Sequence, residues 1–270
     1  MNFLNHTPYP AKFLSGSTGQ SEIIGIVVCK VTYRLRDNII VPVTEDEAWP
    51  VFDKPYEFRG VSFAPEVDFR KNDIDILIFG DAVAPGKKST RTLDVSARCG
   101  RIHHQLAVFG DRFWHAREGG LSPTDPEPFV TMPLTNDRAF GGSAIMAGAE
   151  VFHPINPEGR GFLCEKQQVE GTLLPNLEDP DSLIVHWRDM PRPACWYKPV
   201  GMLQSKKSLN TTSEKFPLEM MQSMFNLAVP ELIAQPEDLG KMLHLSGLSE
   251  DGDVAFPVPD LEGPTVVSNV

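Results

Sequence analysis

The chain has 270 residues, a formal net charge of −11, 41% apolar residues and 23% charged residues. This composition is ordinary for a globular protein and excludes disorder over most of the length. The acidic balance disfavours nucleic acid as the main partner, because proteins bind phosphate backbones through an excess of Lys and Arg. The 24 prolines and 21 glycines argue against a helical bundle, since proline interrupts the hydrogen-bond ladder of a helix.

The charged residues are unevenly distributed along the chain. From Gly86 to Arg117, seven Lys or Arg residues stand against two Asp residues, whereas one Lys stands against eight Asp or Glu residues from Leu227 to Val270. Two interpretations of the basic segment remain open. It forms one solvated strand face, or it is a docking patch for an acidic partner.

The N-terminus and the cysteines indicate the compartment. Residues Met1 to Ser15 contain no basic region followed by an apolar stretch, and the longest apolar run, near Ile23–Val31, is too short to cross a bilayer. The four cysteines are isolated and form no C-x-x-C motif, which indicates neither a zinc site nor a dithiol redox pair. We therefore expect a soluble, cytoplasmic protein with no cofactor, no metal and no membrane insertion.

Several segments alternate apolar and polar side chains, which is the pattern of half-buried strands. Gly100-Arg101 separates the two clearest of them and predicts a β-hairpin. The predicted strands are Ile23–Leu35, Ile74–Val83, Thr90–Cys99 and Ile102–Phe109, and a final hairpin spans Met242–Val258.

The second half of the chain is richer in proline, so only short elements are expected from Ser122 to Pro199, such as Phe129–Leu134 and Leu183–Trp187. One helix is predicted at Pro217–Val229, because Pro217 suits a first turn and an apolar stripe follows at helical spacing. The predicted fold is mainly β, an antiparallel β-sandwich or barrel-like sheet core with long Pro/Gly-rich loops and one or two short helices. We expect a single domain over residues 1–270. The only boundary that the pattern offers lies near residue 122, between a β core (1–121) and an irregular half (122–270).

No catalytic or metal-binding motif is present. The chain has no G-x-S-x-G nucleophile elbow and no Gly-rich phosphate loop. His103 and His104 are adjacent on a predicted strand and point to opposite faces, so we expect one to be half-buried and the other exposed, with no shared ion. The carboxylates near Glu178 to Asp181 and near Glu250 to Asp253 are expected in turns and at the surface, not as an acid–base pair.

Three segments combine arginine, aromatic residues and, in two of them, glycine: Asp111–Trp114, Asp137–Gly142 and Asn156–Phe162. Two interpretations stay open. The arginines attach irregular loops to the sheet by binding carbonyl groups, or the segments form a recognition surface, since Arg and aromatic residues are enriched where proteins bind one another. The candidate partner-binding residues are Arg112, Trp114, Arg138, Phe140, Arg160 and Phe162.

Five segments, in this order, resemble a known bacterial family: Val108–Trp114 (VFGDRFW), Pro126–Leu134 (PEPFVTMPL), Arg138–Gly142 (RAFGG), Asn156–Phe162 (NPEGRGF) and Leu174–Pro180 (LPNLEDP). The family is called domain of unknown function 2169, and the family-like spacing extends from about Ile24 to Val258. One departure is Val83, where the family pattern has His or Tyr.

The resemblance implies a function in type VI secretion, because genes of this family lie beside type VI secretion genes, near those for PAAR-like spike-tip proteins and toxic effectors. It implies a non-catalytic chaperone or adaptor, which binds an effector or its PAAR-like protein, stabilises it and promotes its loading. Two alternatives remain. One is a hydrolase or carbohydrate-active enzyme with a site assembled across the fold, to which His104, Asp94 and Arg138 would contribute. The other is a structural component of the secretion apparatus.

Overall fold

The computed structural model describes residues 3–17, 23–36, 39–54, 56–58, 61–63, 66, 74–163, 169–198 and 228–258. The described residues belong to two compact units, one within residues 3–66 and one made of residues 74–163, 169–198 and 228–258. The prediction of a mainly β, antiparallel fold is confirmed. The single domain and the boundary near residue 122 stay predictions, because a division by contacts does not show which parts fold on their own.

The described residues of the first unit form three antiparallel strand pairs and one short 3-10 turn. β1 (Ala11–Ser17) pairs with β2 (Ile23–Cys29), β3 (Tyr33–Arg36) pairs with β4 (Ile39–Pro42), β5 (Tyr56–Phe58) pairs with β6 (Val61–Phe63), and η1 spans Glu45–Glu47. The single strand predicted over Ile23–Leu35 is therefore wrong in its extent. The chain leaves one pair after Cys29 and enters the next at Tyr33, so two short strands replace one long strand.

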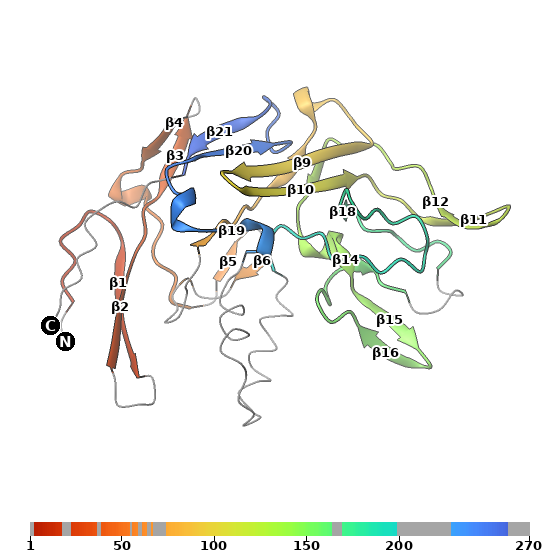
Figure 1. The fold of residues 1–270 in the computed structure, drawn as a ribbon, viewed down its shortest axis with the longest axis horizontal. Coiled ribbons are helices and arrows are strands. Elements are labelled where there is room, and N and C mark those ends of the chain that lie inside the picture. Colours follow the sequence, from red (N-terminus) through yellow and green to blue (C-terminus); the bar gives the residue numbers. More distant parts are fainter. Residues whose placement is uncertain are drawn as a thin grey trace. The chain divides into compact units, whose positions relative to one another are not determined.

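The second unit is built on a five-stranded antiparallel sheet (Figure 1). Its strands, in order across the sheet, are β18 (Leu177–Glu178), β10 (Ile102–Phe109), β9 (Thr92–Cys99), β20 (Met242–Ser246) and β21 (Val254–Pro257). The two predicted hairpins are confirmed, and β20 of the final hairpin pairs with β9.

The alternation of β9 and β10 sets the two faces of this sheet. Val95, Ala97 and Leu106 are fully buried on one face, whereas Arg98 and His103, which are directly opposite each other, are exposed on the other face. The period of two in the sequence therefore predicts which side chains enter the core.

The second unit also contains shorter strand pairs. They are β7 (Ile74–Asp75) with β19 (Ile233–Ala234), β8 (Asp81–Val83) with β13 (Thr131–Pro133), β11 (Trp114–Arg117) with β12 (Gly120–Pro123), β15 (Ser143–Met146) with β16 (Ala149–Phe152), and the parallel pair of β14 (Phe140–Gly141) with β17 (Arg160–Gly161). The strand predicted over Ile74–Val83 is thus split between two partners, and Leu183–Trp187 forms no strand.

The described helical segments of this unit are single 3-10 turns, η2 (Pro85–Lys87), η3 (Asn136–Arg138), η5 (Pro230–Leu232) and η6 (Pro236–Asp238). The helix predicted at Pro217–Val229 lies outside the described residues except for its last two positions. In the described part of the chain, no helix is long and apolar enough to cross a membrane.

The basic and acidic segments found in the sequence contact each other. Lys87 forms an ion pair with Glu250, and Arg101 Nε lies 3.3 Å from Asp238 Oδ2 and its Nη2 3.7 Å from Glu237 Oε1. Part of the basic charge is therefore neutralised within the second unit, which favours a structural role for these residues over a docking patch.

Candidate functional site

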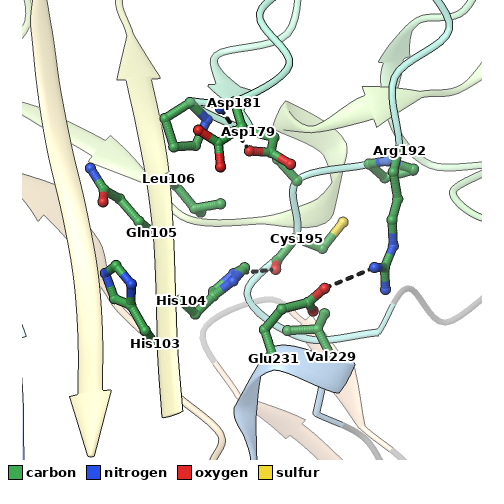
Figure 2. Close-up of a pocket in the computed structure, with 13 residues that line it drawn as sticks. His103, His104, Gln105, Leu106, Asp179, Asp181, Arg192, Cys195, Val229 and Glu231 are labelled. Carbon is green, nitrogen blue, oxygen red and sulfur yellow. Dashed lines mark hydrogen bonds and ion pairs between the residues drawn. The ribbon is translucent and has the colours of Figure 1, made fainter. Parts of the chain in front are cut away.

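A cleft of about 510 Å³ lies along β10 in the second unit, within the usual size range of ligand-binding sites (Figure 2). Four segments line it: residues 103–106 of β10, residues 179–181, residues 192–195, and Val229 with Glu231. Three of these segments come from the second half of the chain, and all four are brought together only by the fold.

The cleft runs along the backbone edge of β10. His103, His104, Gln105 and Leu106 are consecutive strand residues, so their side chains alternate between the two faces of the sheet. All four nevertheless line one cleft, and β9 occupies the other edge of the strand. The cleft must therefore open onto the edge of β10 that faces away from β9.

β18 ends at the point where the cleft begins. Extending the register between β10 and β18 by two residues would place Pro180 opposite Gln105. Pro180 has no N–H to donate to a strand partner. The chain also turns here, because Ser182 N–H donates to Asp179 O at 2.9 Å and Asp181 N–H donates to Asp179 Oδ1 at 2.9 Å. The proline and the turn together leave the edge of β10 open.

His104 is held by contacts inside the cleft. Its Nε2 lies 3.0 Å from the Cys195 carbonyl oxygen, which can only accept, so Nε2 carries the proton and donates. Its ring centroid lies 4.9 Å from that of Trp196. Burial lowers the pKa of His104 although the Cys195 carbonyl opposes the shift, so the imidazole is neutral at pH 7.

His103 points to the other side of the strand from His104 (Figure 2) and is exposed. The expectation of one half-buried and one exposed imidazole is confirmed. Among the described residues, no group of three His, Cys, Asp or Glu side chains is placed to hold a metal ion.

The protonation state of the remaining reactive group and the charges of the other polar groups of the cleft are also defined. Burial raises the pKa of the Cys195 thiol to about 12, so it is protonated at neutral pH and is a poor nucleophile. Arg192 Nη1 pairs with Glu231 Oε1 at 2.8 Å. Asp179 and Asp181 are the other charged side chains. Three carboxylates therefore face one guanidinium, which leaves an excess of two negative charges.

The residues of the hydrolase alternative do not meet in this cleft. Asp94 is paired with Ala107 across β9 and β10, and this places it on the face of the sheet opposite His104. His104 and Asp94 therefore do not share a site.

Arg112, one of the six predicted partner-binding residues, is buried inside the second unit beside β18. Its side chain is 7% exposed and forms an ion pair with Glu178, whose side chain is 1% exposed. Its Nη2 also donates to the Pro175 carbonyl at 2.9 Å, and its guanidinium lies 3.9 Å from the ring centroid of Phe109. Arg112 thereby attaches the segment before β18 to the end of β10.

Two further candidates, Arg138 and Arg160, meet at the fully buried Asn176. Asn176 Oδ1 accepts from Arg138 Nη1 at 3.0 Å and from Arg160 Nη1 at 3.3 Å. Asn176 Nδ2 donates to the Phe109 carbonyl at 3.1 Å and to Asp111 Oδ1 at 2.9 Å. One amide therefore links all three Arg-containing segments.

The Gly-rich segments pack on each other. β14 and β17 pair in parallel, and Gly142 N–H donates to the Asn156 carbonyl at 2.8 Å. Gly142 has φ +94°, and a Cβ at this position would lie 2.3 Å from the Gly159 carbonyl oxygen. Arg160 Nε also joins these two segments, because it donates to the Asp137 carbonyl at 2.7 Å.

The three aromatic candidates belong to the apolar core. Trp114 and Phe140, each 2% exposed, form a buried cluster with Val169, Leu174 and Ile184, and Phe162 packs against it. The interpretation that the arginines attach loops by binding carbonyl groups is therefore observed for Arg112 and Arg160. Buried side chains would reach a partner only if the loops above them moved, and their role in partner binding stays a prediction.

The sequence did not identify Asn176 and Glu178 as central residues. Glu178 was expected in a turn or at the surface, but it is 2% exposed, and only Asp179 and Asp181 form the turn. Burial raises the pKa of Glu178 against the opposing attraction of Arg112. In the sequence, Asn176 and Glu178 both lie close to Leu174 and Leu177. Two leucines in a short segment indicate a buried segment, and its polar residues are then buried as well.

A protein-family model described as an uncharacterized protein conserved in bacteria (DUF2169) matches residues 20–269. No curated protein matches the chain. No solved structure matches it either.

Proposed function

Because the chain belongs to the DUF2169 family of bacterial proteins, we propose that it is a non-catalytic chaperone or adaptor of type VI secretion. It acts in the bacterial cytoplasm, where it binds a specific effector or the PAAR-like spike-tip protein of that effector. Binding stabilises the effector and promotes its loading onto the spike. The secretion role is supported by the family resemblance of the five ordered sequence segments.

The binding role is supported by the protonation and the pairing of the polar groups in the cleft. The imidazole of His104 is neutral and engaged with a carbonyl, the Cys195 thiol is protonated, and Glu231 is paired with Arg192. Such groups fix the position of a bound chain through hydrogen bonds and charge, and a protonated thiol is a poor nucleophile.

Deletion of the gene tests this function. We expect the abundance and delivery of the effector encoded beside it to fall, and an effector encoded elsewhere to be unaffected, because an adaptor serves one cargo. Restoring the wild-type chain should restore both quantities. Unchanged effector abundance and delivery would contradict the adaptor role, and loss of delivery of every effector would indicate a structural component of the apparatus.

A further inference from the structure

The edge of β10 offers unused backbone hydrogen-bonding groups. Phe109 N–H donates to the Asn176 carbonyl at 2.8 Å, away from β9. In an antiparallel ladder, alternate residues direct both their N–H and their C=O to the same neighbouring strand. Ala107, Gln105 and His103 therefore direct theirs to this same edge, where Ala107 is paired with Glu178 of β18.

His103 and Gln105 have no backbone partner on this edge among the described residues. Each offers one N–H and one C=O to the cleft. A strand edge of this kind is a template for another extended chain, which gains main-chain hydrogen bonds by adding to the sheet. The cleft gives such a chain a place to lie, because Pro180 and the turn at Asp179 prevent β18 from covering the edge.

The charges of the cleft specify the composition of the added chain. Arg192 and Glu231 neutralise each other at 2.8 Å, so the uncompensated charges are those of Asp179 and Asp181. Asp181 is exposed. Opposite charges across an interface favour association and disfavour wrong partners. The side chain that lies beside this turn should therefore be a lysine or an arginine.

We propose that the cleft binds an extended, basic segment of a partner protein, which adds to the five-stranded sheet by pairing with His103 and Gln105 of β10. This inference rests on the proposed function and specifies how the cargo is held. The segment needs no fixed sequence at the positions that only supply main-chain groups. It needs a basic residue near Asp181.

The test uses the full-length chain and a phage-displayed library of short random peptides. Selection should yield basic peptides, and a synthetic consensus peptide should bind the wild-type chain. Gln105→Ala removes the same side chain and keeps the edge N–H, so it is the reference against which Gln105→Pro is measured. Gln105→Pro removes one edge N–H without removing a bond to β9, so it should weaken binding about tenfold or more. Asp181→Lys should weaken binding and reduce its dependence on salt.

A second measurement does not depend on the folding of Gln105→Pro. A series of peptides is N-methylated at one position each. Binding to the wild-type chain should weaken only when the methyl group is on every second residue, because alternate residues of the added strand direct their N–H to β10. Three results would overturn the inference: no selected peptide, equal affinity for Gln105→Pro and Gln105→Ala, or insensitivity to N-methylation. Slow hydrogen exchange of the His103 and Gln105 amides in the free chain would also overturn it, since another segment of the same chain would then occupy the edge.

The fate of the effector separates this inference from the proposed function. If the neighbouring effector co-purifies equally with Gln105→Pro and Gln105→Ala, the adaptor role stands and the β10 edge is not its site. If the wild-type chain binds peptides at the edge and does not bind the effector, the edge is a binding site and the adaptor role is wrong.

Discussion

At the scale of single residues, a buried polar network joins segments that have little regular structure. Arg112 and Glu178 form its buried ion pair, and Asn176 uses both ends of its amide. Buried charges are tolerated only when they are paired and hydrogen-bonded. Glu178 meets this condition, because Oε1 faces Arg112 and Oε2 accepts from Ile184 N–H at 2.7 Å. The network therefore holds the turn at Asp179 in place beside β10.

Breaking the ion pair on one side should be costlier than removing both partners. We expect Glu178→Gln to lower the free energy of unfolding by about 3–5 kcal/mol, because it leaves the guanidinium of Arg112 buried without its counter-charge. Replacing both residues by Met should lower it by less than the sum of the losses of Glu178→Met and Arg112→Met, because each single replacement leaves one buried charge unpaired. Urea unfolding of the wild type, the two single Met variants and the double variant measures the difference. A double variant as costly as that sum would show that the two side chains act independently.

The buried imidazole of His104 predicts a dependence of stability on pH. Its folded pKa is lowered by burial, so the unfolded chain binds a proton more readily. The stabilisation is complete above about pH 6.5, the ordinary histidine value, and is lost progressively as the pH falls below it. His104→Gln retains a donor for the Cys195 carbonyl and does not titrate, so it should lose less stability than the wild type between pH 7.5 and pH 5.5. Urea midpoints at the two values test this, with the exposed His103→Gln as the matched control; equal losses in His104→Gln and the wild type would contradict it.

At the scale of elements, the sheet was predictable where strands alternate strictly. β9 and β10 follow from the period of two in their sequences, and the final hairpin follows from two short segments on either side of a turn at Glu250–Asp253. Ile23–Leu35 is also apolar, but it divides between two local pairs, β1 with β2 and β3 with β4. Ile74–Val83 divides between β19 and β13, which are far away in the sequence. The contact between the Gly-rich segments was not predictable either. Irregular backbone has no periodicity that would show which loops meet.

The packing of β14 on β17 predicts different effects for two glycines with similar backbone angles. A methyl group added at Gly142 (φ +94°) would lie 2.3 Å from the carbonyl oxygen of Gly159, whereas one added at Gly148 (φ +82°) would have nothing within 4 Å. Gly148→Ala should cost only the strain of a left-handed residue, about 1–2 kcal/mol. Gly142→Ala should cost about 2 kcal/mol more, because the backbone of Gly159 must also move. Thermal unfolding of both variants compares them, and equal losses would mean that the two loops are not in close contact.

The candidate cleft depends on an element boundary that the sequence pattern does not show. The effect of Pro180 depends on the register between β18 and β10, whose extension would place it opposite Gln105. The pairing of β18 with β10 joins residues that are far apart in the chain and involves only two residue pairs. The histidine pair on β10 was recognised as split between two faces, and the open edge beside it could not be inferred from alternation alone.

At the scale of the whole molecule, the uneven charge in the sequence has a partly internal explanation. The C-terminal acidic residues Glu237, Asp238 and Glu250 form ion pairs with Arg101 and Lys87 of the basic segment. Exposed ion pairs contribute little to stability, about 0–1 kcal/mol each. Their main consequence is that part of the charge of the basic segment is neutralised, whereas the cleft on β10 retains an excess of carboxylates. An acidic cleft favours a basic segment of the cargo.

Co-purification is the most direct test of the claim that this protein holds an effector without transforming it. The chain and the effector encoded beside it are co-expressed, and their complex is analysed by size-exclusion chromatography with mass measurement of both proteins. We predict a stable complex of fixed stoichiometry, in which the effector is recovered with its mass unchanged and is more abundant than when expressed alone. An effector that is equally abundant without the chain and does not co-elute with it, or one recovered with an altered mass, would contradict the account.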